Sequence, residues 1–289
     1  MAFTLTIKRK GLFNKKQVSL EQLLSSCNFR YGSDNEFFIL QESEINNQTM
    51  ILYNPNRIGR GIFLDASQME RGTLTISYNI PTTASEIQDF IHFTEQIVSQ
   101  YEKVEMYCVE EERNYTLEEL VANKENMVAF SLQSLHDFCN NKEYMSHIFT
   151  LAMWPWVLTE EQVQKFESCE DLCEFEEIMH NMQCIDVYYA KPRLYLKNEK
   201  VAAFYVLTEE CESIFPIKAD NFINLDQIEI EEGCIQFYIF SEDRMLDGLY
   251  DFDKFMKIML ERGVETFDKD HVRIPSLTKQ DIEEIVAKL

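Results

Sequence analysis

The stretch Gly72-Thr-Leu-Thr-Ile-Ser-Tyr78 begins the segment that decides the fold. Apolar and polar residues alternate along it, which is the pattern of a strand with one buried face. A loop follows, and then a helix whose apolar residues recur at i, i+3, i+4 and i+6 from Ile87. The β-branched and aromatic run at 104–109 predicts a second strand. A strand, a helix and a strand in this order predict a right-handed crossover between two parallel strands.

The same order recurs near the end of the chain. Gly233-Cys-Ile-Gln-Phe-Tyr-Ile239 predicts a strand, a helix with the same apolar spacing begins at Phe252, and a strand follows at 264–267. This similarity indicates either a degenerate duplication or a coincidence, because amphipathic helices share this spacing for physical reasons alone. Between the two segments, a hairpin joining 193–196 to 202–207 adds an antiparallel pair of strands.

Helix starts are marked by capping boxes, in which a Ser or Thr side chain and a Glu or Gln three residues later satisfy each other's backbone N–H groups. The boxes are Ser19 with Gln22, Thr83 with Glu86, Thr116 with Glu119, and Thr159 with Gln162. No convincing strand is found between about 116 and 184. The sequence therefore predicts an α+β fold with two small mixed-sheet units, residues 1–112 and 186–289, around a helical middle segment, residues 113–185.

Charge excludes several classes of function. The chain has 289 residues, with 27 Lys and Arg against 50 Asp and Glu, and a net charge of −23. Such a charge repels nucleic-acid phosphates and anionic membranes. The longest apolar run, 148–158, is interrupted by Pro155 and is too short to span a bilayer. Since no secretory signal is found either, we expect a cytoplasmic protein whose eight cysteines are mostly reduced.

The first 31 residues are basic, unlike the rest of the chain. They contain Lys8, Arg9, Lys10, Lys15, Lys16 and Arg30, with Glu21 as the only acidic residue. A basic segment on an acidic protein can dock onto the acidic surface, within one chain or between two copies. The alternative is a short edge strand whose charges discourage pairing with other strands. Self-association through this segment is therefore one expectation.

Short motifs in the first 110 residues resemble a family of uncharacterised proteins from Gram-positive bacteria, a domain of unknown function. The motifs are Gly-Leu-Phe-Asn-Lys-Lys at 11–16, Arg30-Tyr31-Gly32, Tyr53-Asn54-Pro55, Ile58-Gly59-Arg60-Gly61, and the strand from Gly72 that leads to Ile80-Pro81-Thr82. The resemblance implies a bacterial cytoplasmic protein. It implies no catalytic residue.

The segment Arg57-Ile58-Gly59-Arg60-Gly61 is the best candidate for a ligand site. Backbone N–H groups in a glycine-rich turn can form a nest for an anion, and arginine adds paired donors. Arg57, Gly59, Arg60 and Gly61 are thus the predicted ligand-binding residues, for a phosphate, a carboxylate or an acidic side chain. The alternative is a tight turn whose arginines pair with the chain's own carboxylates.

Cysteine and histidine residues give two weaker candidates. If one helix runs from Glu160 to about Gln183, then Cys169, Cys173, His180 and Cys184 share one face. The outermost pair is then ~22 Å apart, far beyond what Zn–S bonds of ~2.3 Å allow. No metal and no other cofactor is therefore expected. His136 and Cys139 are spaced i, i+3, but Cys139 lies near a helix end, where the helix dipole disfavours a thiolate.

Both tryptophans lie in Met153-Trp154-Pro155-Trp156-Val157-Leu158. Tryptophan is enriched among residues that anchor protein interfaces, so Trp154 and Trp156 are the predicted partner-binding residues. The alternative is a hydrophobic linker packed inside the chain.

These patterns predict an interaction or regulatory module whose partner is another protein. The alternative is an enzyme that acts on a small anionic substrate held by Arg57 and Arg60. No recognisable catalytic spacing supports the enzyme, but catalytic sites also assemble from residues distant in sequence, so the sequence leaves enzyme activity undecided.

Overall fold

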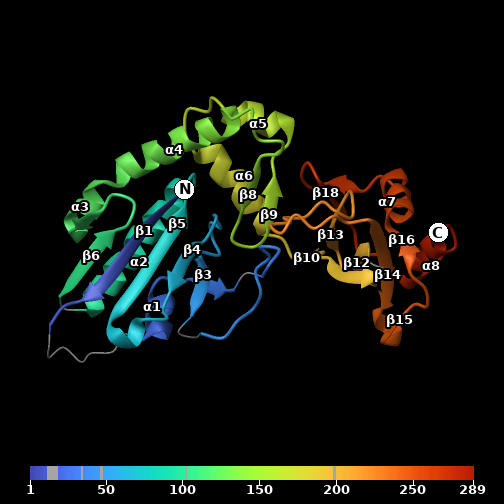
Figure 1. Cartoon of the computed structure of the whole chain (residues 1–289), viewed down its shortest axis with the longest axis horizontal. Helices are drawn as coiled ribbons and strands as arrows, with labels where there is room; N and C mark the ends of the chain where they lie inside the picture. The colour runs from blue at the N-terminus through green and yellow to red at the C-terminus, as the bar shows by residue number, and fades with distance from the viewer. Residues whose placement is uncertain (12–18, 34, 46–47, 102, 198–199) are drawn as a thin grey trace. The chain divides into compact units, whose positions relative to one another are not determined.

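The computed structural model describes residues 1–11, 19–33, 35–45, 48–101, 103–197 and 200–289. The chain forms two compact units, Met1–Cys184 and Ile185–Leu289. Both combine sheets with helices, which confirms the α+β class (Figure 1). The helical middle segment predicted at 113–185 is not separate, because its helices pack against the first unit and belong to it.

The first unit is built on a seven-stranded sheet with the order β2-β3-β4-β5-β1-β6-β7. The strands are β1 (Ala2–Arg9), β2 (Arg30–Gly32), β3 (Thr49–Tyr53), β4 (Ile62–Asp65), β5 (Thr73–Asn79), β6 (Val104–Cys108) and β7 (Arg113–Tyr115). All neighbouring pairs are antiparallel. The prediction of a mixed sheet in the first unit is therefore wrong. β5 and β6 are parallel to each other as predicted, but β1 lies between them and runs the opposite way.

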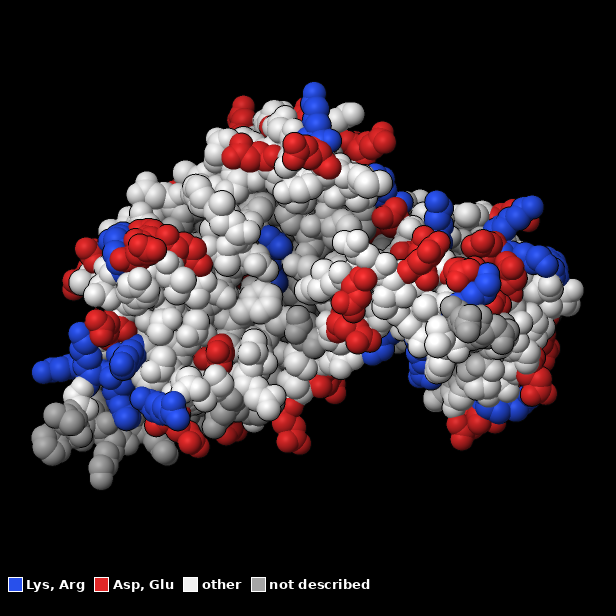
Figure 2. Space-filling model, viewed as in Figure 1, with Lys and Arg blue, Asp and Glu red and all other residues white. Residues whose placement is uncertain are grey.

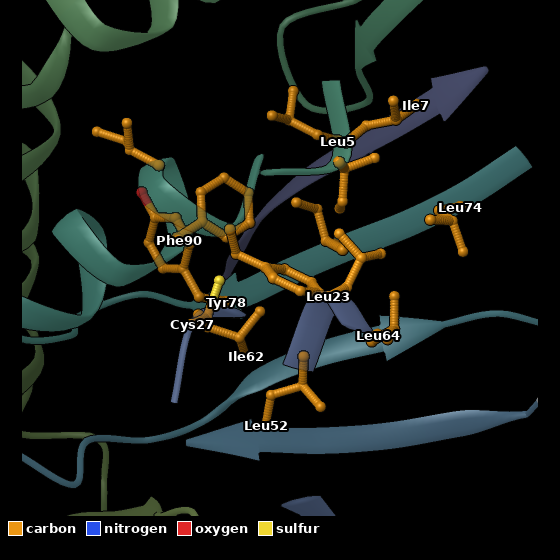
Figure 3. Close-up of a cluster of buried hydrophobic side chains, with 14 of the residues drawn as sticks. Leu5, Ile7, Leu23, Cys27, Leu52, Ile62, Leu64, Leu74, Tyr78 and Phe90 are labelled. Atoms are coloured by element: carbon orange, nitrogen blue, oxygen red, sulfur yellow. The ribbon is translucent and has the colours of Figure 1, made fainter. Parts of the chain in front are cut away.

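The core of this unit lies between the sheet and two helices, α1 (Leu20–Ser26) and α2 (Ala84–Gln100) (Figure 1). Alternation along β5 buries Leu74, Ile76 and Tyr78, as the sequence predicts. From α2, Phe90 meets the ring of Tyr78 edge-on, with 4.9 Å between ring centroids. Figure 3 shows Leu74, Tyr78 and Phe90 within this cluster of buried apolar side chains.

Four further helices complete the first unit, with two short strands between them. They are α3 (Leu117–Ala122), α4 (Lys124–Asn140), β8 (Ile148–Thr150), β9 (Pro155–Val157), α5 (Glu160–Phe166) and α6 (Cys173–Gln183). Strands β8 and β9 pair with each other, so the expectation of no strand between about 116 and 184 is wrong. The single helix considered for 160–183 is interrupted between α5 and α6. Just before α6, the Asp171 carboxylate accepts a hydrogen bond from the Cys173 N–H at 2.9 Å, a local turn that competes with a continuous helix.

The second unit contains a mixed five-stranded sheet and a mixed four-stranded sheet, as predicted. The five-stranded sheet comprises β11 (Arg193–Lys197), β12 (Lys200–Thr208), β14 (Glu232–Ile239), β15 (Arg244–Met245) and β16 (Tyr250–Asp251). The four-stranded sheet comprises β10 (Tyr188–Tyr189), β13 (Ser213–Pro216), β17 (Glu265–Thr266) and β18 (His271–Ile274). The predicted hairpin is confirmed, because β11 and β12 pair in antiparallel fashion. Helices α7 (Phe252–Glu261) and α8 (Lys279–Val286) bury their apolar faces in the same core. Two 3-10 turns, Met69–Arg71 in the first unit and Phe240–Glu242 in the second, complete the elements.

The two strand–helix–strand segments differ in topology. In the first unit, β5 and β6 belong to one sheet. In the second unit, β14 belongs to the five-stranded sheet and β17 to the four-stranded sheet. The common apolar spacing of α2 and α7 is therefore what two amphipathic helices share, and the topology does not support a duplication. Within the described ranges, none of the helices combines the length and apolarity needed to cross a bilayer.

Candidate functional site

The predicted anion nest lies in the loop between β3 and β4. Gly61 has φ of +88°, a left-handed conformation that favours glycine. A Cβ atom at Gly59 would lie 2.6 Å from Oε1 of Glu86, so the backbone approaches this carboxylate closely. The glycines of the motif are therefore required by the loop itself and by its contact with helix α2.

The anion in this nest is the side chain of Glu86. Its Oε1 accepts a hydrogen bond from the Gly61 N–H at 2.6 Å, and its Oε2 accepts one from the Arg60 N–H at 3.2 Å. The Thr82 hydroxyl also donates to Oε2. Glu86 is only 4% exposed. Burial raises the pKa of this carboxyl group, while the hydrogen bonds from Thr82, Gly61 and Arg60 oppose the rise.

The position of Glu86 explains why its capping box is incomplete. Thr83 caps α2 as predicted and accepts a hydrogen bond from the Glu86 N–H at 3.0 Å. The Glu86 side chain, however, turns away from the helix cap and enters the nest. The boxes at Thr116 and Thr159 are complete, so the difference at α2 comes from the tertiary partner and not from the local sequence.

Arg60 uses its guanidinium group inside the first unit. Its Nε donates to the Thr150 carbonyl at 3.1 Å, its Nη1 to the Pro81 carbonyl at 3.0 Å, and its Nη2 to the Thr150 hydroxyl at 3.2 Å. The group also lies over the ring of Phe149, 5.1 Å from the centroid. Burial lowers the pKa of Arg60 to about 10, and the charge of Glu86 opposes this change.

The other residues of the β3–β4 loop are also held by hydrogen bonds with groups of the first unit. Arg57 donates to both carboxylate oxygens of Asp89, from Nη2 at 2.7 Å and from Nε at 3.3 Å. The Ile58 N–H donates to Nδ1 of His180 at 3.0 Å, and Gln183 donates to the Gly59 carbonyl at 2.9 Å. Helices α2 and α6 thus fix the loop from two sides. The predicted residues Arg57, Gly59, Arg60 and Gly61 do come together, around carboxylates that the chain itself provides.

The cysteine and histidine candidates do not gather into one site, although Sγ of Cys169 lies 3.7 Å from Nε2 of His136. Among the described residues, no three His, Cys, Asp or Glu side chains are grouped so that they could hold a metal ion. Cys173 and Cys184 are exposed at opposite ends of α6, and His180 accepts the loop hydrogen bond described above. Burial raises the pKa of Cys139 to about 12, which disfavours a nucleophilic thiolate.

Trp154 and Trp156 are 4% and 0% exposed. Trp156 stacks with Phe175, and it also contacts Phe149 and Phe166. A partner docking on the first unit would not reach these rings. The prediction that the tryptophans anchor a partner is therefore replaced by the packing alternative, because Trp154 is buried and Trp156 belongs to the core between α4, α5 and α6.

The basic segment lies in part outside the described residues, since these exclude Lys15 and Lys16. Figure 2 shows basic side chains gathered at one end of the first unit, where β1 ends. There Lys10 forms an ion pair with Glu105 at 3.4 Å, and its N–H donates to the Lys103 carbonyl. Self-association through this segment stays a prediction.

Sequence reasoning missed a groove in the second unit, a cavity of about 700 Å³. It is bounded by the turn 217–220, the start of β14 and the exposed side of α7. Its apolar lining comes from Ile217, Ala219, Ile230, Met256 and Leu260. No sequence signal marks this groove, because its walls come from three separate segments, 217–220, 230–233 and 253–261, and none of them carries a recognisable binding motif.

Charged side chains form the rim of this groove. They are Lys218, Asp220, Glu231, Glu232, Asp253, Lys257 and Glu261, so carboxylates exceed amines by five to two. Glu231 pairs with Lys200 at 2.6 Å. Within the part of the chain that the structure describes, Asp220, Asp253 and Glu261 form no ion pair, and they remain available to a cationic ligand.

A protein-family model described as "Domain of unknown function (DUF4299)" matches residues 2–285, nearly the whole chain. No curated protein and no solved structure matches the chain significantly.

Proposed function

Since the chain belongs to the DUF4299 family, whose description states no function, we propose one from the geometry: a binding module that takes a basic, amphipathic segment of a partner protein into the groove of the second unit. The observation that carries this proposal is an apolar groove whose rim holds Asp220, Asp253 and Glu261, which form no ion pair with any residue that the structure describes. The anion nest of the first unit supports no comparable function, because Glu86 and Asp89 already use its donors.

The floor of the groove supplies the apolar part of the interaction. Met256 lies at its base, and Ile217 and Ile230 are half-buried on its walls. Leu260 projects from α7 and is 48% exposed. A groove of about 700 Å³ lies within the size range of binding sites that bury apolar side chains. A helix or an extended segment with apolar residues on one face would cover these side chains.

The rim determines which partner is preferred. Asp253 and Glu261 lie one at each end of α7, on either side of Leu260, and Asp220 lies on the facing turn. Lysine or arginine residues beside the apolar anchors would meet these carboxylates. The net charge of −23 would also accelerate the encounter with a basic partner at low ionic strength.

The proposal is tested with two synthetic probes that differ only in charge. One is an amphipathic peptide of leucine and lysine, and the other has glutamate in place of lysine. We expect the lysine peptide to bind the 289-residue chain and to perturb amide signals around α7 in a two-dimensional NMR titration. We expect no binding of the glutamate peptide, because its charges face the same carboxylates.

A charge reversal separates the groove from general electrostatics. The variant Asp253→Lys/Glu261→Lys is expected to bind the lysine peptide about tenfold more weakly, since each rim contact contributes up to ~1 kcal/mol. The variant Asp247→Lys/Glu283→Lys changes the net charge equally at exposed positions outside the groove, and we expect less than a twofold loss. Equal losses in both variants would contradict a specific groove.

A further inference from the structure

We propose that the groove of the second unit takes the end of strand β11 from a second copy of this chain, so that two copies associate about a twofold axis with Leu196 of each in the groove of the other. This inference rests on the proposed function, because it names the partner of the same groove. It concerns a different segment from the basic N-terminal residues. The observations that carry it are an exposed leucine, complementary charges and the position of both features at one end of one sheet.

The walls of the groove are fixed by packing inside the second unit. A Cβ atom at Gly233 would lie 2.4 Å from Cβ of Ala219 and 3.0 Å from Cβ of Phe252. The start of β14, the turn 217–220 and the start of α7 therefore meet at this glycine. The Tyr205 hydroxyl also donates a hydrogen bond to the Ala219 carbonyl at 2.9 Å. Since the groove is formed within one copy, a ligand does not have to order it.

Strand β11 carries an apolar side chain that its own unit does not cover. It is the edge strand of the five-stranded sheet, and β12 is its only pairing partner among the described elements. Leu194, two residues before Leu196 on the same face, packs against the core of the unit. Leu196 itself is 76% exposed. The apolar face of β11 thus extends beyond the core, and a second surface that buried Leu196 would gain apolar contact area.

The segment around Leu196 is basic, although the chain as a whole is strongly acidic. Residues 191–200 contain four basic residues and one acidic residue, namely Lys191, Arg193, Lys197, Lys200 and Glu199. The groove rim has the opposite balance, with five carboxylates and two amines. Lys200 pairs with Glu231 of the rim in its own chain at 2.6 Å. Asp253 and Glu261 stay available to the basic residues of a second copy, so the two surfaces are complementary in charge.

Leu196 and the groove lie on the same face and at the same end of the sheet. Leu196 pairs with Val201 of β12, so these two side chains share a face. Ala203, two residues later on that face, pairs with Gly233 of the groove. The N–H of Glu231, at the groove rim, donates to the Val201 carbonyl at 3.0 Å. Because neighbouring strands are ~4.8 Å apart, Leu196 lies only ~10 Å from the rim.

This short separation favours a closed pair of copies. A twofold axis that passes between Leu196 and the groove brings each leucine to the groove of the other copy, and both contacts form together. An arrangement with one contact would leave one leucine and one groove uncovered. The twofold pair is therefore the arrangement that buries both apolar features in both copies.

Sedimentation velocity of the 289-residue chain tests the association directly. We expect the average mass to rise from one chain toward two as the concentration rises from micromolar to millimolar. Salt should favour the monomer, because the rim charges are exposed. Leu196→Asp is expected to weaken the dimer about tenfold or more, since it removes the apolar contact and places a carboxylate against an acidic rim. The control Leu249→Asp changes another exposed leucine of the unit, outside the groove, and should change the Kd less than twofold.

A mixture of two variants tests which surfaces meet. Leu196→Asp keeps its groove, and Asp253→Lys/Glu261→Lys keeps its leucine, so one intact contact forms only between the two variants. We expect each variant alone to be mostly monomeric and the mixture to associate more tightly than either. A mixture that associates no better than the separate variants would overturn the proposal, because it would mean that Leu196 does not enter the groove.

The leucine–lysine peptide separates this inference from the proposed function. By occupying the groove, it should dissociate the dimer, and it should bind Leu196→Asp at least as tightly as the original chain. If the peptide binds but the chain stays monomeric at every concentration, a second copy is not the partner, and the function of the groove still stands. If the peptide does not bind and the chain stays monomeric, both proposals are wrong. A dimer that the peptide leaves intact would place the interface elsewhere and overturn the inference.

Discussion

Replacement of Glu86 by alanine tests the central contact of the first unit. The change removes the acceptor for the Gly61 N–H, the Arg60 N–H and the Thr82 hydroxyl, and all three groups are buried. It also leaves the buried Arg60 guanidinium without its nearest negative charge. Leaving a buried donor unsatisfied costs about 1–3 kcal/mol, and here three are affected. We therefore expect Glu86→Ala to lower the free energy of unfolding by about 4 kcal/mol, a large share of the 5–15 kcal/mol of a typical domain.

The assay can be restricted to the unit that changes. Both tryptophans, Trp154 and Trp156, lie in the first unit, so tryptophan fluorescence during urea unfolding reports on that unit alone. The matched control is Glu95→Ala on the same helix, where the carboxylate is 40% exposed and contacts only His92 among the described residues. We expect this control to stay within about 0.5 kcal/mol of the original protein.

A double-mutant cycle identifies the cause of the loss. If the unpaired Arg60 charge accounts for part of it, Glu86→Ala combined with Arg60→Met is less destabilised than the sum of the single changes, by about 1–3 kcal/mol. A Glu86→Ala variant within about 0.5 kcal/mol of the original protein would refute the reasoning. It would mean that water or a neighbouring group satisfies the nest without the carboxylate.

Three further outcomes are expected. Burial raises the pKa of Cys139 from 9.0 to about 12, so the thiol loses its proton at lower pH in the unfolded chain than in the folded one. The free energy of unfolding should therefore fall as the pH rises from 9 to about 12. Urea titrations of Cys139→Ala should show a smaller decrease over this pH range. Exposed Cys173 and Cys184 should be the first thiols to react with Ellman's reagent, and a mass spectrum with modification elsewhere would contradict their exposure. In the second unit, Tyr189→Phe removes the hydroxyl that lies 2.9 Å from Nε2 of buried His271, and should cost about 1–3 kcal/mol in thermal unfolding.

Local patterns predicted the elements well, because alternation and capping depend on neighbours in the chain. The strand at 73–79 and the helix caps at Thr83, Thr116 and Thr159 lie where the sequence places them. Strand order was not accessible in this way. β1 lies between β5 and β6, and this pairing depends on contacts about 70 to 100 residues apart along the chain.

The side chain of Glu86 shows the same limit of prediction from local sequence patterns. The sequence identified both the nest at 57–61 and the Glu86 position three residues after Thr83, but treated them as unrelated. A capping bond from Glu86 to the helix start would contribute about 1 kcal/mol. In the nest, the same carboxylate satisfies two buried N–H groups and a hydroxyl, and leaving these unsatisfied would cost 1–3 kcal/mol each.

The tertiary contact therefore outweighs the local one, and it also explains why a strongly acidic chain keeps two arginines beside two glycines. Arg57 and Arg60 hold the β3–β4 loop against α2 and β8, and the chain's own carboxylates occupy the positions in which a substrate anion was expected. A ligand that displaced Glu86 would have to expose this buried group and replace all three of its hydrogen bonds. Binding is thus more easily accommodated where carboxylates are already solvated, as at the rim formed by Asp220, Asp253 and Glu261.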